Sequence, residues 1–429
     1  MKKLYEIVKK DNSKVLGGNL LASLFGLLNF MLMIRITSKF DFGLIVIFLS
    51  AAGLADLIRT GFVRQGLVRE WVMNDAEDKS NLIGSSWLLH LLIGGVIVLL
   101  CYMTMAGVSL LSLEIDNYIL LIQFYPLLLL ASIPHQMESW LAQGKKHYLT
   151  MNVFRLAVNI IFFLILIFNY GGQQLSAIQI IQYLILSHAG VSLIALIKLR
   201  SIREIRNAKW NQIVSLFNFG KYSLSTLAGS NLLKSTDTLL IGLLINAESA
   251  AIYAIPFKVI ELLEIPLRGF VMTSFHSLTQ WYKLKNQADY SRHFQLSVLR
   301  LTLVFLPVVL VSLLVPHLVV EFLGGADYSE SVYILQVLAF AMLIMPLDKF
   351  AGMALDSNNQ PDVNAKKVWM MVGVNLIGDL LIITLGGPLW MIASITILNI
   401  LFGVSYGIIR NHFLRLSINI NWAQLIPIH

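Results

Sequence analysis

The stretch FKVIELLEIPLRGF, residues 257–270, places four charged side chains in an otherwise apolar segment. Lys258, Glu261, Glu264 and Arg268 recur every three or four residues, which is the spacing of one face of a helix. Arginine and lysine attract phosphate and carboxylate groups, and a guanidinium can bind two oxygens of such a group at once. Carboxylates can hold a proton or a sodium ion. The spacing therefore predicts a charged helical face suited to an anion and, through its acids, to a small cation.

Other apolar segments carry the same combination of charges. Asp56 and Arg59 are three residues apart, as are Lys234 and Asp237. A charge that faces lipid costs about 2.5 to 3.5 kcal/mol on insertion scales, so intramembrane charges usually face a bundle interior or water. The predicted site has two groups: substrate-binding Arg59, Lys234, Lys258 and Arg268, and ion-coupling or charge-balancing Asp56, Asp237, Glu261 and Glu264. An alternative stays open for each pair, because residues four apart, such as Glu264 and Arg268, also form structural salt bridges.

The composition explains what surrounds these charges. Of the 429 residues, 57% are hydrophobic and only 13% are charged, and the mean hydropathy is +0.74. A soluble globular chain has about 25% charged residues. Apolar runs of about 20 residues recur along the chain, and each can cross a hydrocarbon core of about 30 Å. The chain is therefore predicted to be an all-α integral membrane protein.

We predict twelve transmembrane helices. The ranges are 15–35, 41–63, 81–106, 117–142, 151–169, 175–197, 213–245, 249–280, 294–320, 329–355, 364–385 and 388–410. With the N-terminus in the cytoplasm, the predicted cytoplasmic loops collect Lys and Arg, whereas the opposite side holds only Arg35 and Lys39, as expected from the positive-inside rule. Both termini are accordingly predicted to be cytoplasmic, and the net charge of +8 is mainly a topology signal rather than a sign of nucleic-acid binding.

Weak internal similarity indicates a duplication. Matching residues recur in order at nearly constant offsets: Arg59 with Arg268 at 209, Pro134 with Pro346 at 212, and Asn159 with Asn375 at 216. Two halves of six helices each have the same orientation in the membrane, and transporters built this way bind substrate where the repeats meet. We predict a six-helix lobe at 1–197, a basic cytoplasmic linker at 198–212 and a second six-helix lobe at 213–429, as two parallel lobes with a central cavity.

Several function classes find no support in the sequence. The chain has one cysteine, Cys101, so an intramolecular disulfide is excluded, and no Cys/His spacing typical of a zinc site is present. We predict no metal site. The phosphate-binding pattern GxxxxGK[ST] is also absent, so we predict no ATP site and no cofactor, with H+ or Na+ as the candidate coupling ion.

Two rival functions differ in the residues that they require. A membrane enzyme that acts on a lipid carrier needs positioned acid and base groups in an extracytoplasmic loop, and the predicted loops offer only Glu114 with Asp116 and Asp327 with Glu330. A transporter is therefore favoured over an enzyme. An exporter of drugs or organic cations is the closer rival, but such cargo favours a carboxylate-rich cavity, whereas the predicted one is rich in Lys and Arg.

Two longer stretches resemble a known family. In residues 235–263 an aspartate, a leucine-rich run, a short acidic turn and a Tyr-Ala pair follow one another, with Asp237, Tyr253 and Ala254 at the matching positions. Residues 328–360, YSESVYILQVLAFAMLIMPLDKFAGMALDSNNQ, form the second stretch. With the twelve-helix layout, they resemble the Wzx-type oligosaccharide and polysaccharide flippases of the multidrug/oligosaccharidyl-lipid/polysaccharide (MOP) exporter superfamily. The patterns are degenerate, and the likeness covers essentially the whole chain.

The resemblance implies a protein of the bacterial inner membrane. It would carry an undecaprenyl-diphosphate-linked oligosaccharide from the cytoplasmic to the periplasmic leaflet by alternating access of its two lobes. Family members are described with a cationic central cavity that includes basic residues on the second and eighth membrane helices, to which Arg59 and Arg268 correspond by helix position. The implied partners are the lipid-linked oligosaccharide, membrane lipid and other polysaccharide assembly proteins.

Overall fold

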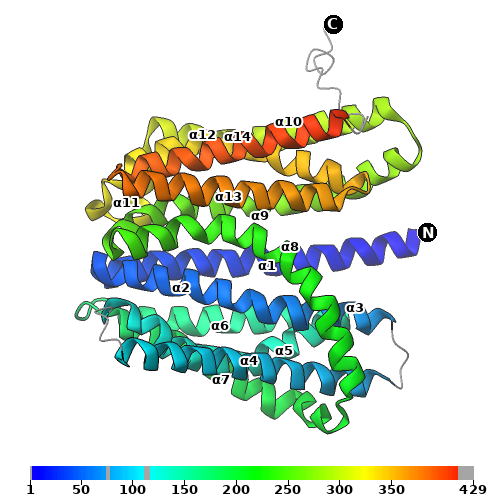
Figure 1. Ribbon diagram of the computed structural model, residues 1–429, viewed down its shortest axis with the longest axis vertical. Coiled ribbons are helices and arrows are strands. Elements are labelled where there is room, and N and C mark those ends of the chain that lie inside the picture. Colours follow the sequence, from blue (N-terminus) through cyan, green and yellow to red (C-terminus); the bar gives the residue numbers. More distant parts are fainter. Residues whose placement is uncertain (1, 74–77, 111–115, 414–429) are drawn as a thin grey trace, which may run out of the picture. The chain divides into compact units, whose positions relative to one another are not determined.

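The computed structural model describes residues 2–73, 78–110 and 116–413, and this part of the chain is built of helices (Figure 1). The helices are α1 (Lys2–Ile36), α2 (Lys39–Arg59), η1 (Thr60–Arg64), α3 (Gln65–Met73), α4 (Lys79–Leu110), α5 (Asp116–Gly144), α6 (Tyr148–Phe168), α7 (Ala177–Leu199), η3 (Ser201–Asn207), α8 (Trp210–Leu244), α9 (Ala247–Lys283), α10 (Gln287–Leu314), α11 (Pro316–Gly324), η4 (Ala326–Tyr328), α12 (Ser331–Ser357), α13 (Pro361–Thr384) and α14 (Leu389–Phe413).

Each of the twelve predicted ranges overlaps a helix. Eight helices in the described part are long and apolar enough to cross a membrane: Lys39–Met73, Lys79–Gly107, Tyr148–Phe168, Ala177–Lys198, Gln287–Leu314, Ser331–Ser357, Pro361–Thr384 and Leu389–His412. The prediction of an all-helical protein with multiple membrane-spanning helices is therefore confirmed. The full twelve-helix, two-lobe layout stays a prediction.

One predicted range differs from the structure in its detail. The sequence predicts one helix over residues 294–320, but α10 ends at Leu314 and α11 begins at Pro316. Val315 between them has a non-helical backbone, with φ −134° and ψ 48°. A proline at the first helical position has no N–H to donate and is favourable there, whereas inside a helix it removes a hydrogen bond. Pro316 therefore starts a new helix.

The helices α8 and α9 do not meet the apolar criterion for a spanning helix. They carry six of the eight predicted site residues, namely Lys234, Asp237, Lys258, Glu261, Glu264 and Arg268. Charged side chains lower the mean hydropathy of any window that contains them. The sequence feature that marks these helices as functional is thus also the one that weakens their hydropathy signal.

The chain forms two compact units, Met1–Asn231 and Leu232–His429. The boundary falls inside α8, which is continuous from Trp210 to Leu244 (Figure 1). The predicted lobes divide instead at the linker 198–212, and that division stays a prediction.

The first unit has a core of apolar side chains from α2 to α8. Fully or nearly fully buried members include Phe48, Leu67, Trp87, Leu129 and Leu216. Close helix approach helps to close this core, because a side-chain carbon at Gly220 of α8 would clash with the Phe62 Cα in η1. Only glycine fits so close to another backbone, so Gly220 allows η1 and α8 to pack backbone to backbone.

Helix starts in the first unit are tied together by capping. The Ser38 hydroxyl accepts a hydrogen bond from the Asp41 N–H at 3.0 Å and so caps α2. The Asp41 carboxylate accepts from the Ala177 N–H at 2.9 Å, at the start of α7. Ser176 and Gln179 form a reciprocal capping box at the same place. These contacts align α2 and α7 at one end of the unit.

The second unit is organised around α12. This helix packs against α9, α10 and α14 (Figure 1), and 61% of its most apolar window is buried, against 22% to 33% in the other candidate spans. Asn246 caps α9 by accepting from the Ser249 N–H at 2.7 Å. The second unit therefore packs the charged helix α9, together with α10 and α14, against a central, buried helix.

Candidate functional site

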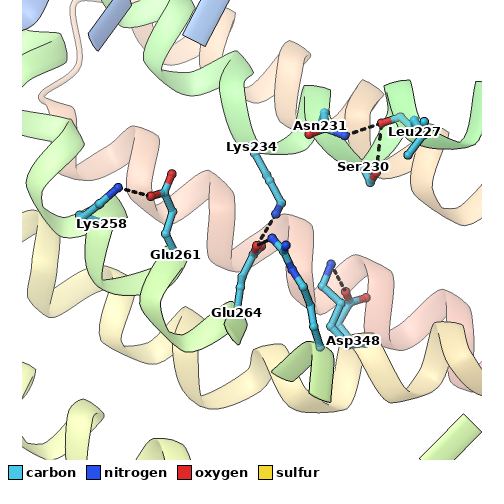
Figure 2. Close-up of polar contacts among 10 residues, drawn as sticks. Leu227, Ser230, Asn231, Lys234, Lys258, Glu261, Glu264 and Asp348 are labelled. Atoms are coloured by element: carbon cyan, nitrogen blue, oxygen red, sulfur yellow. Dashed lines mark hydrogen bonds and ion pairs between the residues drawn. The ribbon is translucent and has the colours of Figure 1, made fainter. Parts of the chain in front are cut away.

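In the second unit one carboxylate holds two cations. Glu264 on α9 accepts from the Lys234 ammonium on α8 and, at 2.7 Å, from the Arg268 guanidinium one turn further along α9 (Figure 2). Both contacts reach the same oxygen, Oε2. The Glu264 side chain is 11% exposed, whereas that of Arg268 is 69% exposed. The cluster carries one more positive than negative charge. Its exposed member is Arg268, and a guanidinium can bind two phosphate oxygens at once.

The other predicted pair of α9 is a separate salt bridge. Lys258 donates to Glu261 at 2.6 Å (Figure 2), and the two side chains are 20% and 50% exposed. This pair has no net charge. The predicted face of α9 thus consists of a neutral pair and a cationic cluster. Salt bridges of the kind that the spacing left open form in both, between Lys258 and Glu261 and between Glu264 and Arg268.

Asp237 on α8 is buried and lies in a different network. Three groups from three helices donate to its carboxylate: the Tyr253 hydroxyl of α9 at 2.6 Å, the Asn375 amide of α13 at 2.6 Å and the Thr396 hydroxyl of α14 at 3.1 Å. Asp237 is 1% exposed and Tyr253 is completely buried. Among the described residues no basic side chain pairs with this carboxylate.

A second carboxylate belongs to the same network. The Asn375 amide nitrogen also donates to Asp379, one turn along α13, at 3.0 Å, so a single nitrogen contacts both acids. Asp379 is completely buried, and its Oδ1 has no hydrogen-bond partner among the described residues. Two buried carboxylates that lie this close together repel each other unless a proton or a cation is shared. The Asp237–Asp379 pair is therefore a cation-accepting arrangement.

The eight site residues predicted from the sequence do not include Asn375, Asp379 or Thr396. Asn375 and Asp379 are four residues apart, so they share a helix face. That spacing was the available signal. The contact of Asp379 with Asp237 joins residues 142 positions apart in the sequence, and no local pattern reveals such a pairing.

In the first unit the predicted pair is centred on a buried arginine. Arg59 is 0% exposed and forms a salt bridge with Asp56, whose side chain is 36% exposed. The Tyr125 hydroxyl donates to the same Asp56 oxygen at 3.0 Å. Both terminal nitrogens of Arg59 also donate to the Ser132 hydroxyl at 3.2 Å. The guanidinium is thus held by protein groups from α2 and α5.

A histidine completes this network. The Arg59 Nη1 lies 3.4 Å from the His90 Nε2 of α4. Since a guanidinium has only donors, Nε2 must be the unprotonated nitrogen and Nδ1 must carry the hydrogen. That Nδ1 has no partner among the described residues, and neither has the Arg59 Nε. The network is densely bonded but not fully satisfied.

A further buried pair links α12 and α13. Lys367 of α13 is 3% exposed and donates to Asp348 of α12 at 2.7 Å. Lys349, adjacent to Asp348, lies 3.9 Å away and is 42% exposed. A buried charge needs a partner, and Asp348 supplies it. Asp348 therefore belongs to an α12–α13 contact.

The remaining predicted groups do not form a site that the structure describes. Glu114 and the side chain of Asp116 lie outside the described residues. Asp327 lies in η4 and Glu330 at the start of α12. The described residues contain no group of three or more His, Cys, Asp or Glu side chains that could hold a metal ion.

Comparison with known proteins identifies related sequences and folds. The model of a family described as "Polysaccharide biosynthesis protein" matches residues 8–275, well over half of the 429 residues. The "Probable low-salt glycan biosynthesis flippase Agl15" of Haloferax volcanii is 22% identical over 180 residues, which span 42% of this chain and 38% of that protein. The chain thus aligns with much less than two thirds of that relative.

Two solved structures are similar over nearly their whole length. An inward-facing multidrug resistance MATE family transporter of the MOP superfamily has a TM-score of 0.73 at 13% identity, with 92% of this chain and 95% of that chain covered. The lipid II flippase MurJ in an inward closed conformation has a TM-score of 0.68 at 14% identity, with 93% and 89% covered. At these identities the likeness shows the fold alone.

Proposed function

Because the chain belongs to the polysaccharide biosynthesis protein family, we propose that it moves a lipid-linked sugar from one membrane leaflet to the other. The name of the similar Haloferax protein, a glycan biosynthesis flippase, supports this assignment. So does the fold shared with a lipid II flippase. The chain acts as a transporter and not as an enzyme in this proposal.

The detailed proposal concerns substrate and direction. The substrate is an undecaprenyl-diphosphate-linked oligosaccharide that moves from the cytoplasmic to the periplasmic leaflet of a bacterial inner membrane. Twelve membrane helices in two six-helix lobes, with both termini cytoplasmic and a cationic central cavity, carry it by alternating access. Lipid-linked oligosaccharide and membrane lipid are the proposed partners, with other polysaccharide assembly proteins beside them.

The observation that carries this proposal is the surplus cation at Glu264. Lys234 and Arg268 share one carboxylate oxygen, so a diphosphate that approaches Arg268 meets a net positive charge. Because the Arg268 side chain is already 69% exposed, its guanidinium can bind phosphate oxygens while it is still bonded to Glu264. Lys258 offers less, since Glu261 neutralises it. Arg59 would first have to leave Asp56 and Ser132.

The test is translocation of a fluorescent undecaprenyl-diphosphate oligosaccharide in proteoliposomes. We expect the native chain to flip the lipid and Arg268→Gln to slow flipping by about tenfold, the loss of one charge-assisted hydrogen bond. Lys258→Gln is the matched comparison on the same helix, and a smaller effect is expected. Arg292→Gln removes an exposed cation of α10 and controls for net charge.

Two results would contradict the proposal in different ways. If the native chain flips no diphosphate carrier, the substrate is wrong. If it flips the carrier and Arg268→Gln does so equally fast at matched insertion, the anion site is wrong and the cluster at Glu264 is a structural salt bridge.

We further propose that the Asp237–Asp379 pair binds the coupling ion, which is H+ or Na+. Its two carboxylates, together with the Thr396 and Tyr253 hydroxyls, supply only oxygen ligands, which suit a hard cation. Asp237 was predicted as an ion-coupling residue, and Asp379 joins it here. Asp56, Glu261 and Glu264 then balance charge, because each pairs with a basic residue.

Replacing Na+ by choline at constant pH distinguishes the two ions. Flipping that stops without Na+ assigns a sodium site, and flipping that continues but follows an imposed pH gradient assigns a proton site. Asp379→Asn should abolish either dependence, whereas Asp348→Asn, a matched change in the α12–α13 contact, should leave it. Ion dependence that survives Asp379→Asn would contradict the assignment.

One observation favours a second candidate function. The buried carboxylates Asp237 and Asp379 would also suit an organic cation, and the similar MATE structure belongs to a multidrug resistance transporter. A drug exporter would move small cations in the same proteoliposomes without flipping the diphosphate carrier. Hydrolysis or transfer of the lipid-linked sugar would instead indicate a membrane enzyme.

A further inference from the structure

The segment between α7 and α8 separates its charges by face. Helix α7 ends at Leu199, and Arg200 takes up a left-handed conformation with φ 53° that turns the chain into η3. The short helix η3, with sequence SIREIRN, packs against α4. Ile202 and Ile205 are part of the packing around the apolar core of the first unit. The apolar side of the segment is therefore already covered by the unit to which it belongs.

The segment is fixed on the first unit by polar contacts. The Ser201 hydroxyl accepts from the Trp87 indole at 2.8 Å and donates to the buried Glu138. The Lys209 N–H donates to the Ser85 hydroxyl at 2.9 Å. A side-chain carbon at Gly84 would clash with the Glu204 carbonyl oxygen, so α4 and η3 touch through their backbones. The segment is therefore held in a defined position on the first unit.

The acid of the segment is held against the unit and its bases point out. Glu204 accepts from Ser80 and, at 2.8 Å, from Asn207, and these bonds lower its pKa. Arg203, Arg206 and Lys209 are exposed. Neither Arg203 nor Arg206 has a side-chain hydrogen bond or ion pair with any residue that the structure describes. Within the described residues, the outer face is thus a row of cations without acidic partners.

The position of this face relative to the membrane follows from α7. The candidate span Ala177–Lys198 ends two residues before Arg200, about 3 Å along a helix. The headgroup layer on each side of the hydrocarbon core is about 5 to 8 Å thick. Trp210, 68% exposed, follows directly, and tryptophan is enriched at that depth. Basic clusters next to a membrane helix attract anionic lipid headgroups.

We propose that the outer face of this segment, formed by Arg200, Arg203, Arg206 and Lys209, is a binding surface for anionic phospholipid headgroups. The occupant is a membrane phospholipid with a net negative charge, such as phosphatidylglycerol. A zwitterionic lipid lacks the charge that this face complements. The proposal concerns a bound lipid and does not depend on the transported substrate.

Native mass spectrometry of the full chain in detergent tests this surface. The probes are phosphatidylglycerol and phosphatidylcholine with identical acyl chains. We expect the native chain to prefer phosphatidylglycerol, and Arg203→Gln/Arg206→Gln to weaken the tightest binding on the order of tenfold. Lys283→Gln/Lys285→Gln, which removes two exposed cations at the end of α9, should keep the preference. Both variants should unfold at the native temperature, since they alter exposed side chains.

Three outcomes would overturn the proposal. The linker variant could keep the native preference, or the control could lose as much of it, which would mean that only overall charge matters. Inorganic pyrophosphate at millimolar concentration could displace the lipid, which would assign this face to a diphosphate. Failure of lipid flipping in proteoliposomes contradicts the proposed function but leaves this result untouched.

Discussion

Two arginines at matching positions of the predicted repeat have opposite surroundings. Arg59 in the first unit is fully buried and is bonded to Asp56 and Ser132. Arg268 in the second unit, 209 residues later, is 69% exposed and contacts one carboxylate. A guanidinium with protein partners on several sides stabilises the fold, whereas an exposed one can exchange its partner for a ligand. The two arginines that the predicted repeat matches therefore differ in how readily they could exchange a protein partner for a ligand.

A second pair of matched positions, Asn159 and Asn375, differs in the charge of the side chain that contacts each of them. In the first unit the Asn29 amide of α1 donates to the Asn159 carbonyl of α6 at 3.1 Å. In the second unit the Asn375 amide of α13 donates to Asp237 of α8. Asn159 and Asn375 are matched in the predicted repeat. The partner of Asn159 is the amide Asn29, whereas the partner of Asn375 is the carboxylate Asp237. At this pair of positions, the buried carboxylate belongs to the second unit.

The largest effect is expected at Arg59. Arg59→Ala should destabilise the chain by about 3–5 kcal/mol, because it leaves Asp56 without its cation and opens a cavity. Arg268→Ala should cost less than about 1 kcal/mol, as expected of an exposed ion pair. Thermal unfolding of both variants in detergent measures the difference. Equal losses would show that the two arginines have the same role.

Exchanging the amide of the first unit for an acid tests the second difference. Asn29→Asp should cost on the order of 3 kcal/mol at neutral pH, because the buried carboxylate would face the Asn159 carbonyl without a donor. Asn29→Ala, which loses only the hydrogen bond, should cost about 1 kcal/mol. The two unfolding temperatures give the contrast. If the Asn29→Asp variant is as stable as the alanine variant, the first unit also accommodates a buried charge.

Two tyrosines allow a finer comparison of the carboxylates. Tyr253→Phe removes a donor from Asp237, which is 1% exposed, and should cost about 1–3 kcal/mol. Tyr125→Phe removes a donor from Asp56, which keeps Arg59 and has a 36% exposed side chain, so water can replace the hydroxyl. A smaller loss of stability is expected. Chemical unfolding of the two variants in parallel measures the difference, and the opposite order would contradict it.

The smallest effect is expected at Glu204, an acid at the surface. Hydrogen bonds from Ser80 and Asn207 lower its pKa, so its contribution to stability is present above the unfolded pKa of about 4.3 and is lost as the pH falls through the lower folded pKa. Glu204→Gln should therefore lower the unfolding temperature slightly at pH 7 and have no further effect at the acid end. A difference from the native chain that grows in acid would have the wrong sign.

Much of the architecture could be predicted from local sequence. Runs such as 81–106 and 151–169 are predominantly apolar, and each overlaps a helix of the structure. Apolar helices are stable in the hydrocarbon core because their backbone hydrogen bonds are satisfied internally. Hydropathy therefore predicts such helices without information about their neighbours. Exceptions arose at Pro316, where the backbone begins a new helix, and in α8 and α9, where charge lowers the apolar signal.

The partners of the charges could not be predicted in this way. Lys234 is three residues from Asp237 in sequence, yet its partner is Glu264, 30 residues away. Asp237 instead meets Asn375, 138 residues away, and through it Asp379. Lys367 is buried against Asp348, 19 residues away on another helix.

The sequence alone determined that the chain is a membrane protein, where its helices lie and which of them carry charge. These properties depend on the free energy of placing each residue in hydrocarbon, which is local. Only the tertiary structure decided which charges neutralise one another, which arginine is buried and where two acids share one amide. Those outcomes depend on how neighbouring helices rotate and pack, and spacing within one helix contains no information about its neighbours.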